Sequence, residues 1–278
     1  MNFGWLESLM FGAVTGLAEI LPVSTQAHTS LLVKFMGKGN IPALMSLFMH
    51  MGVLTGIYIS CQSHILKMVR AKKISRIPKK KRKRPLDTKS LMDLKLLVTM
   101  LLPVVIGLFV FQKTEATSFN MIIMATLLFL NGLILYIPQF LPSSNKDCRT
   151  LSRVEGLLMG LGGALFAIPG FSGVGAALSV ASVAGVDRKY GLSMILLMDM
   201  GIVAGKFVFD LLGIFSGGLG HLSATVLLSY LLTAVVSFVA AYLAVKILRH
   251  LAESKGYGFF AYYSWGMALF TFVFSLMA

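Results

Sequence analysis

The chain has 278 residues, of which 56% are hydrophobic and only 13% are charged. Its mean hydropathy of +0.82 excludes an ordinary soluble domain or a disordered chain and indicates a polytopic membrane protein. Lys and Arg number 25 against 11 Asp and Glu, a formal net charge of +14. In so apolar a chain this charge favours topology signals and contact with lipid headgroups over nucleic-acid binding.

The apolar segments predict an all-α fold with six membrane spans and two re-entrant hairpins, since a span needs about 20 apolar residues. Two of the segments are too long for one helix and are broken by "LPVSTQAH" and "IPGFSGVG". Proline, glycine and free polar groups cannot face lipid, so each of these is interpreted as a helix, loop and helix that enters and leaves on one side. In chain order we expect a hairpin at 5–36, spans at 41–62, 91–111 and 120–141, a hairpin at 154–185, and spans at 191–215, 223–247 and 258–277.

The basic residues predict the orientation of these spans. Twelve of the 25 Lys and Arg fall between Lys67 and Lys89, including "KKKRKR" at 79–84, which predicts a basic cytoplasmic loop over 67–89. The next predicted inside loops carry Lys146, Arg149, Arg153, Arg188, Lys189, Arg249 and Lys255, whereas the predicted outside loops 112–119 and 216–222 carry only Lys113.

This layout divides a single membrane domain, 1–278, into two repeats at 1–141 and 150–278. Each repeat has one hairpin and three spans, and because three is odd, the first hairpin should open outward and the second inward. Such an inverted repeat brings broken helices together near the membrane middle to form a site. In both hairpins a glycine lies six residues before the proline, and a serine follows the proline within three residues.

The ends and thiols of the chain are unremarkable in this interpretation. Cys61 and Cys148 do not form a disulfide framework, so both are predicted to be free thiols. The first residues lack the basic flank and cleavage site of a secretory signal, and the whole chain is taken as mature.

The first hairpin carries unusual polar chemistry for a membrane segment. Glu19 lies three residues before Pro22, and an ionised carboxylate there needs a cation, a metal or several donors. The loop that follows suits a phosphate-like anion, because helix starts carry positive partial charge. Glu19 is then a candidate metal ligand or base and His28 a candidate proton donor or nucleophile. The remaining candidates here are Ser24, Thr25 and Gln26. The alternative is that these side chains only satisfy broken helix ends.

Two further segments contribute candidate residues. In "PGFSGVG" the glycines Gly170, Gly173 and Gly175 allow close backbone approach to a substrate, and Ser172 adds a hydroxyl. In the span at 191–215, three charged residues share one helical face at spacings of seven and four: Asp199, Lys206 and Asp210. They form either a coupling or headgroup site or, for Lys206 with Asp210, a structural i, i+4 pair.

These motifs carry a family resemblance. "GLAEILPVSTQAH" resembles the first motif of the bacterial undecaprenyl-diphosphatase (bacitracin-resistance) family, close to EGxxEFLPVSSTGH. "PGFSGVGAAL" followed by "GVDR" resembles its second, close to PGxSRSGxT and GxxR. "LFMHMGVLTGI" is similar to a third stretch, with His50 at the family's His or Gln position. The similarity covers most of the chain in order.

The resemblance implies removal of the terminal phosphate of undecaprenyl diphosphate at the outer side of the bacterial cytoplasmic membrane, which recycles a lipid carrier for peptidoglycan and confers bacitracin resistance. It also implies help from a divalent cation such as magnesium or calcium. By position, Glu19 matches the second motif glutamate, Ser24 and Thr25 the hydroxyl positions, His28 the histidine and Ser172 the serine before the arginine. Whether the chain forms a homodimer is left open.

The sequence also departs from the family pattern. Thr15 stands at the first glutamate, Gly173 at the arginine, Val174 at the next serine and Ser46 at a usually acidic position. The arginine would clamp a diphosphate, and losing one such partner commonly costs about 10²- to 10³-fold in rate. Three hypotheses follow: a divergent undecaprenyl-diphosphatase, with Lys206 as a candidate replacement for the arginine; a non-hydrolytic polyprenyl-phosphate flippase or lipid-binding relative; and an assembly subunit of the envelope machinery.

Overall fold

The computed structural model of the chain describes residues 4–115, 120–142, 145–217, 223–254 and 257–277. These residues form an all-α fold with no β-strand among them. Lys255, which the sequence assigned to an inside loop, lies outside the described residues. The helices are α1 (Trp5–Ile20), α2 (Thr25–Phe35), α3 (Ala43–Ser75), α4 (Thr88–Glu115), α5 (Met121–Tyr136), α6 (Arg153–Ala164), α7 (Gly173–Val183), α8 (Arg188–Gly217), α9 (Ala224–Ser254) and α10 (Phe259–Met277), with short 3₁₀ turns at Lys79–Lys81, Ile137–Phe140 and Leu165–Ala167.

Six of the described helices are long and apolar enough to cross a membrane, which confirms the prediction of six spans. They are α3, α4, α5 with its 3₁₀ extension, α8, α9 and α10. The protein is therefore a multi-pass membrane protein.

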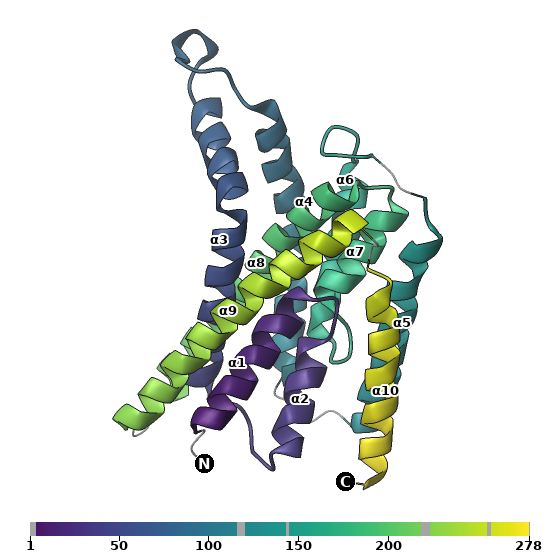
Figure 1. Cartoon of the computed structure of the whole chain (residues 1–278). Coiled ribbons are helices and arrows are strands. Elements are labelled where there is room, and N and C mark those ends of the chain that lie inside the picture. The colour runs from purple at the N-terminus through teal and green to yellow at the C-terminus, as the bar shows by residue number, and fades with distance from the viewer. Residues whose placement is uncertain (1–3, 116–119, 143–144, 218–222, 255–256, 278) are drawn as a thin grey trace.

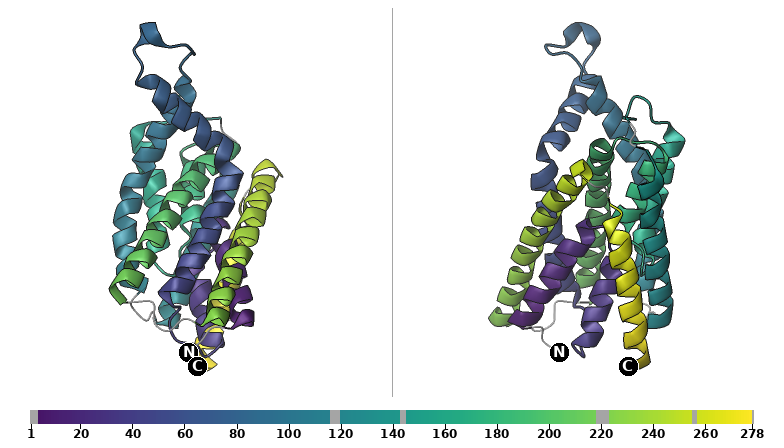
Figure 2. Two further views of the ribbon diagram at one scale, coloured as in Figure 1. Left: turned by 90° about the vertical axis from the view of Figure 1, so that its left-hand side faces the viewer. Right: turned by 45° about the vertical axis from the view of Figure 1, so that its right-hand side comes forward.

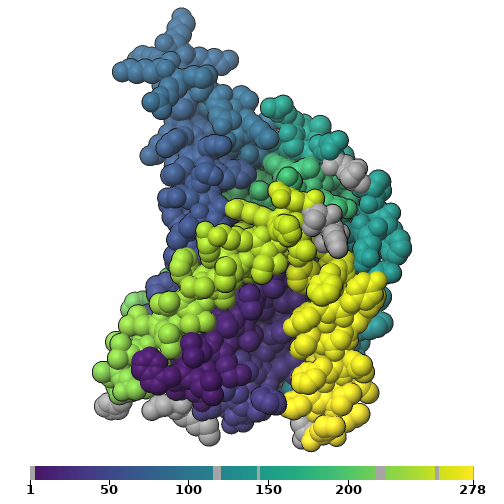
Figure 3. Space-filling view, in the orientation of Figure 1, coloured from purple at the N-terminus to yellow at the C-terminus, as the bar shows by residue number. Residues whose placement is uncertain are grey.

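The predicted basic loop at 67–89 is wrong in its boundaries. Helix α3 continues to Ser75, and α4 begins at Thr88, so the irregular segment is much shorter. Lys and Arg are good helix formers, and basic side chains at a helix C-terminus are stabilised by the helix dipole, so α3 extends into water. Figures 2 and 3 show this extension of α3 and α4 standing clear of the rest of the molecule.

The four short helices form two hairpins that meet in the middle of the bundle. Figure 1 shows α1 and α2 approaching from the end where both termini lie, and α6 and α7 from the opposite end, where α3 and α4 project. The tips touch, since the Gly170 amide donates to the Ser24 hydroxyl oxygen at 3.0 Å.

The helices of the two halves pack against each other in exchanged pairs. Helix α1 packs on α9 and α6 packs on α4, while α3 packs on α8 and α5 on α10. If α1–α5 are matched in order with α6–α10, the α1–α9 pair corresponds to the α6–α4 pair. The α3–α8 and α5–α10 pairs then each correspond to themselves. This is the pattern that two halves related by a pseudo-two-fold axis would produce.

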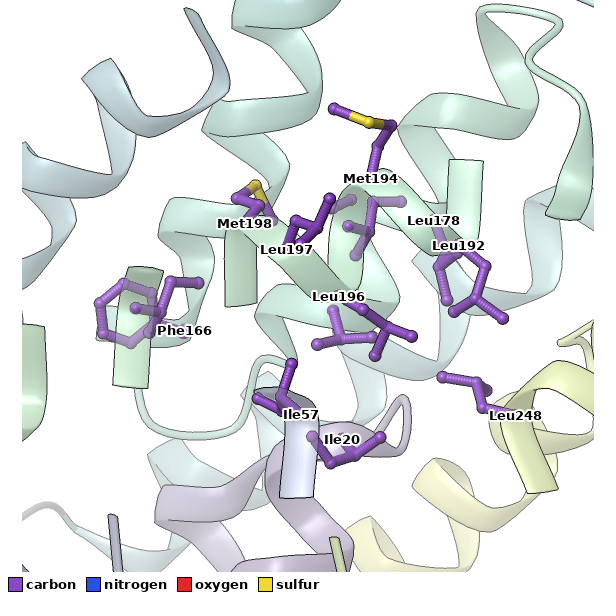
Figure 4. Close-up of a cluster of buried hydrophobic side chains, with 14 of the residues drawn as sticks. Ile20, Ile57, Phe166, Leu178, Leu192, Met194, Leu196, Leu197, Met198 and Leu248 are labelled. Atoms are coloured by element: carbon purple, nitrogen blue, oxygen red, sulfur yellow. The ribbon is translucent and has the colours of Figure 1, made fainter. Parts of the chain in front are cut away.

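Helix α8 forms the centre of the bundle, and most side chains between Leu192 and Met198 are apolar and fully buried. Figure 4 shows Leu192, Met194, Leu196, Leu197 and Met198 surrounded by side chains from other elements, including Ile20, Ile57, Phe166, Leu178 and Leu248. A helix that is hydrophobic all round is one that is buried. Any charged side chain on this stretch of α8 therefore needs a partner inside the protein.

The two cysteines are free thiols, as predicted, and both are buried. Cys148 lies in the connection between α5 and α6. Burial is the main cause that raises the pKa of its thiol to about 11, with the Asp93 carboxylate adding to the effect.

Glycine allows the close approach of α3 to α9, which gives a stability prediction. A Cβ at Gly52 would lie 2.2 Å from the Ala234 carbonyl oxygen, whereas a Cβ at Gly266 on α10 meets nothing within 4 Å. We expect Gly52→Ala to destabilise the protein by about 1–3 kcal/mol because it overpacks a helix interface. Thermal unfolding in detergent measures this, with Gly266→Ala as the matched control. Equal melting temperatures for the two variants would contradict the observed packing.

Candidate functional site

The tips of the two hairpins are built by the same local device. Pro22 ends α1 because a proline cannot continue the helix, and Pro169 has the same place before α7. A serine then caps each following helix: Ser24 accepts from the Ala27 amide at 3.3 Å, and Ser172 accepts from the Gly175 amide at 3.1 Å.

These serines also hold the two tips in place. Ser24 accepts the Gly170 amide of the other hairpin, and the Ser172 amide donates to the Asn131 side chain of α5 at 2.9 Å. Gly170 has φ +107°, which favours glycine. The Gly170 and Gly175 amides, predicted as substrate ligands, are therefore engaged within the protein, and Ser24 has the surroundings of a structural residue.

A buried ion pair lies between the hairpin tips and α8. Lys206 Nζ donates to Glu19 Oε1 at 2.5 Å, and the two side chains are 4% and 3% exposed. The ammonium also lies 5.1 Å from the ring centroids of both Phe111 and Phe166, which makes cation–π contacts on two sides. The partner that the sequence required for Glu19 is thus a lysine from the second half of the chain.

The ion pair lines a small pocket together with Asp199. Its interior of about 10 Å³ is about the space of one water molecule. Three buried oxygens of its lining residues accept no hydrogen bond: Glu19 Oε2, Gln26 Oε1 and Asp199 Oδ2. Buried polar atoms are normally paired, so these three indicate a place where a ligand, an ion or water binds. The Thr25 hydroxyl lies close to the Glu19 carboxylate.

Two helix N-termini also face this pocket. Thr25 and Gln26 are the first residues of α2, and Gly173 and Val174 are the first of α7, and all four line the pocket. Amides in the first turn of a helix have no intrahelical acceptor and carry positive partial charge. The pocket therefore combines an ammonium group and two helix N-termini, which suit a phosphate, with two carboxylates, which suit a base or a metal ligand.

The proposed structural pair of Lys206 with Asp210 is wrong. Lys206 pairs with Glu19, and Asp210 Oδ2 instead lies 2.6 Å from His50 Nδ1 on α3. One turn separates the two residues on α8, but their partners come from different helices. Asp199 and Lys206 belong to the pocket, whereas Asp210 does not line it.

His28 does not line the pocket either. Its Nδ1 donates to the Ser24 carbonyl oxygen at 2.6 Å, and its Nε2 lies 2.7 Å from the Tyr263 hydroxyl, with the two rings stacked. A carbonyl oxygen only accepts, so the Nδ1 proton is fixed and Tyr263 occupies Nε2. In this arrangement His28 and Glu19 do not converge, and His28 positions the Ser24 loop.

Gly173 stands where the family motif has an arginine, and neighbouring atoms of Gly163 and Phe166 occupy the space that a side chain would need. A Cβ at Gly173 would lie 2.5 Å from the Gly163 carbonyl oxygen and 2.9 Å from Phe166 Cβ. The end of α6 thus leaves no room for a side chain at this position. Lys206 enters the same pocket from α8 and brings the cation that Gly173 lacks.

Sequence reasoning missed Asn131 and Tyr263, which support the two hairpin tips. Asn131 is fully buried and bonds to the Ser172 amide and to Ser264. It is a lone amide in an apolar span, and a polar side chain inside a membrane usually has a structural or functional role. That signal could have identified it, whereas nothing in the sequence distinguishes Tyr263 from its aromatic neighbours.

The fold and this site define a polytopic membrane protein with a buried ionic pocket between two broken-helix hairpins. The family model described as bacitracin resistance protein BacA matches residues 8–270. The chain is 29% identical over 276 residues to an undecaprenyl-diphosphatase of Methanobrevibacter smithii, with 98% of each chain covered. It is 27% identical over 270 residues to the undecaprenyl-diphosphatase of a Nocardioides species, with 97% of this chain and 96% of the relative covered.

A third relative, the undecaprenyl-diphosphatase of Alkaliphilus metalliredigens, is 24% identical over 284 residues, with 98% of each chain covered. The family model spans nearly the whole chain, including both hairpins. The chain therefore belongs to the bacitracin resistance protein BacA family, as its motifs indicate.

The buried ion pair gives a second prediction. Removing Lys206 leaves a buried carboxylate without its partner, so we expect Lys206→Met to lower the free energy of unfolding by about 3–5 kcal/mol. The double variant Glu19→Gln/Lys206→Met removes both charges and should recover most of that loss. Denaturation in detergent of the native protein, of Glu19→Gln, of Lys206→Met and of the double variant measures the coupling. A double variant as unstable as the sum of the single variants would contradict a direct ion pair.

Proposed function

We propose that this protein hydrolyses undecaprenyl diphosphate to undecaprenyl phosphate and inorganic phosphate in the cytoplasmic membrane of a bacterial cell, with its polyprenyl substrate drawn from the bilayer. The relatives named above are undecaprenyl-diphosphatases. The single observation that carries the proposal is the buried Glu19–Lys206 pair beside the N-termini of α2 and α7. This arrangement places a cation, a carboxylate and free amides in one pocket.

The anion is held by positive groups of this chain. Lys206 supplies a full charge, and the first amides of α2 and α7 supply partial charges aimed at the same pocket. Such donors stabilise the charge that spreads over the transferred phosphoryl group. The Ser172 hydroxyl oxygen accepts from Gly175, and its proton is left to donate to a phosphate oxygen.

Substrate binding would also prepare the base. When the terminal phosphate approaches, Lys206 exchanges its bond to Glu19 for one to the phosphate, and the Glu19 carboxylate is released. Glu19 can then take a proton from water while the water oxygen bonds to the terminal phosphorus. The bond from that phosphorus to the bridging oxygen breaks, and the polyprenyl monophosphate leaves with the bridging oxygen.

The pocket must open for this reaction, because a diphosphate is far larger than one water molecule. The walls are two hairpin tips linked by the bond from Gly170 to Ser24. Separation of the tips would admit the headgroup while the prenyl chain stays in lipid. Broken helices that meet at the membrane middle are suited to such movement.

We propose that the pocket also holds a divalent cation such as magnesium or calcium. Within the described part of the chain, no three His, Cys, Asp or Glu residues gather closely enough to bind a metal. The unpaired oxygens of Glu19, Asp199 and Gln26 line one pocket, however, and carboxylate and amide oxygens are the ligands that magnesium and calcium prefer. These three residues would hold the ion. Bound there, it would neutralise negative charge on the diphosphate.

Phosphate release from undecaprenyl diphosphate by the purified protein in liposomes tests the proposed activity. We expect Glu19→Ala and Lys206→Met each to lower the rate by about 10²- to 10³-fold, because each variant lacks a side chain that stabilises the transition state. Lys189→Ala, which removes a surface lysine paired with Glu253, is the control and should keep the native rate. A native protein that releases no phosphate would exclude hydrolysis and favour lipid-phosphate transport.

The cation site gives a separate prediction. We expect Asp199→Asn and Gln26→Leu to raise the magnesium or calcium concentration needed for half-maximal rate by about tenfold or more, since the first removes the charge of a ligand and the second removes an oxygen ligand. Titration of the rate with each ion measures this. Asp210→Asn changes a carboxylate one helical turn from Lys206 but outside the pocket and is the control. A cation requirement unchanged in both pocket variants would place the ion elsewhere.

A further inference from the structure

A second polar cavity lies at the end of the bundle from which α3 and α4 project. It has a volume of about 370 Å³ and is formed by the C-terminal parts of α3 and α9 and the N-terminal parts of α4 and α8. This volume is in the range of small-ligand sites, about 300–1,000 Å³. Its lining includes three permanent cations, Lys67, Lys89 and Arg249, and two carboxylates, Asp87 and Asp93.

Both carboxylates are already occupied by neighbours in the protein. Asp93 is buried, with one oxygen 3.0 Å from His64 Nε2 and the other accepting from the Tyr190 hydroxyl at 2.9 Å. Asp87 accepts from the Ser90 amide at 3.0 Å and from its hydroxyl at 2.6 Å. The Ser90 hydroxyl is the main cause that lowers the pKa of Asp87, and the nearby Lys67 charge contributes. Both carboxylates thus have hydrogen-bond donors of their own within the protein, and they offset two of the three positive charges around the cavity.

The cations keep most of their donors free. Lys67 forms no salt bridge within the described residues, and Lys89 Nζ lies 3.9 Å from Asp147 with half of its side chain exposed, which is a weak pair. Arg249 is anchored by one nitrogen, which donates to the Ser60 carbonyl oxygen at 2.7 Å. The guanidinium has five N–H donors, so its remaining ones can bind a ligand.

The position of the cavity connects it with the central pocket. Tyr190 and Ser193 of α8 line the cavity, and Asp199 of the same helix lines the central pocket. Asp199 lies six positions after Ser193, which is about 9 Å along a helix. Cys61 lines the cavity and is near enough to Asp199 to interact with it electrostatically.

We propose that the cavity between α3, α4, α8 and α9 binds a phosphomonoester group, carried either by a polyprenyl monophosphate or by inorganic phosphate. Three cations around a polar cavity at a helix-bundle end are the chemistry that recognises a phosphate headgroup at a membrane surface. The three cations exceed the two carboxylates by one charge, and the serine hydroxyls around the rim supply further donors. The site is separate from the Glu19–Lys206 pocket and binds its ligand without hydrolysis.

Binding of radiolabelled farnesyl phosphate and of radiolabelled inorganic phosphate tests the proposal. The full chain is placed in nanodiscs of phosphatidylcholine, so that no anionic lipid competes. The background is Glu19→Gln/Lys206→Met, which disables the central pocket and keeps its charges balanced. Lys67→Ala/Lys89→Ala removes two cavity cations from exposed positions. Lys72→Ala/Lys73→Ala removes two exposed lysines of α3 that do not line the cavity and is the matched control.

We expect the background protein to bind farnesyl phosphate, and the Lys67→Ala/Lys89→Ala variant to bind it about tenfold or more weakly, because two charge-assisted contacts are lost. The control should bind as the background does. Equal binding of inorganic phosphate would identify the free anion as a sufficient ligand, and binding of farnesyl phosphate alone would identify the lipid.

Three results would overturn the proposal. They are no binding by the background protein, unchanged binding by the Lys67→Ala/Lys89→Ala variant, and an equal loss in the Lys72→Ala/Lys73→Ala control, which would show only general charge attraction. Failure of the hydrolysis proposal is seen separately, in the phosphate-release assay. The two proposals can therefore fail independently.

Discussion

The structure depends on one ion pair between Glu19 and Lys206 in the middle of an apolar bundle. Both side chains are almost fully buried, and removing a charge from water costs several kcal/mol even after relaxation. Neither residue is tolerable there alone. Their pairing therefore fixes the end of α1 against the middle of α8, and it holds one carboxylate and one ammonium at the point where the two hairpin tips meet.

Other contacts between the two halves of the chain also pair polar groups inside the bundle. Ser24 of the first hairpin accepts from Gly170 of the second, and Asn131 of α5 accepts from Ser172. His50 of α3 meets Asp210 of α8. In a membrane each of these polar groups must find a partner inside the protein. These polar groups of one half are thus satisfied by the other, so the site exists only when both halves are assembled.

Sequence periodicity and hydropathy were sufficient for the six spans and for the two interrupted segments, because the need to satisfy every backbone group in lipid leaves few alternatives. They were also sufficient to mark Glu19 as needing a cation. They did not identify that cation, since the spacing along α8 left a pair of Lys206 with Asp210 open as one alternative, whereas in the folded protein Lys206 pairs with Glu19. The end of α3 was also misplaced, because a charged helix in water has no hydropathy signal.

The roles of Ser24 and His28 show a second limit. A motif reveals which residues lie in a loop but not which side chains point inward. Ser24 caps α2 and binds Gly170, and His28 turns to Tyr263, more than 200 positions away in the sequence. Thr25 and Gln26, one and two residues after Ser24, are the ones that line the pocket. Ser24 is the cap of α2 and Thr25 is its first residue, so their different roles depend on where the helix starts. Sequence reasoning places a helix start only approximately.

The most direct test is an experimental structure of the protein in lipid with a non-hydrolysable methylene analogue of undecaprenyl diphosphate. We expect the terminal phosphonate between the first residues of α2 and α7, with Lys206 Nζ within hydrogen-bonding distance of it and Glu19 released from the lysine. A headgroup bound away from this pocket, with Lys206 still paired to Glu19, would contradict it.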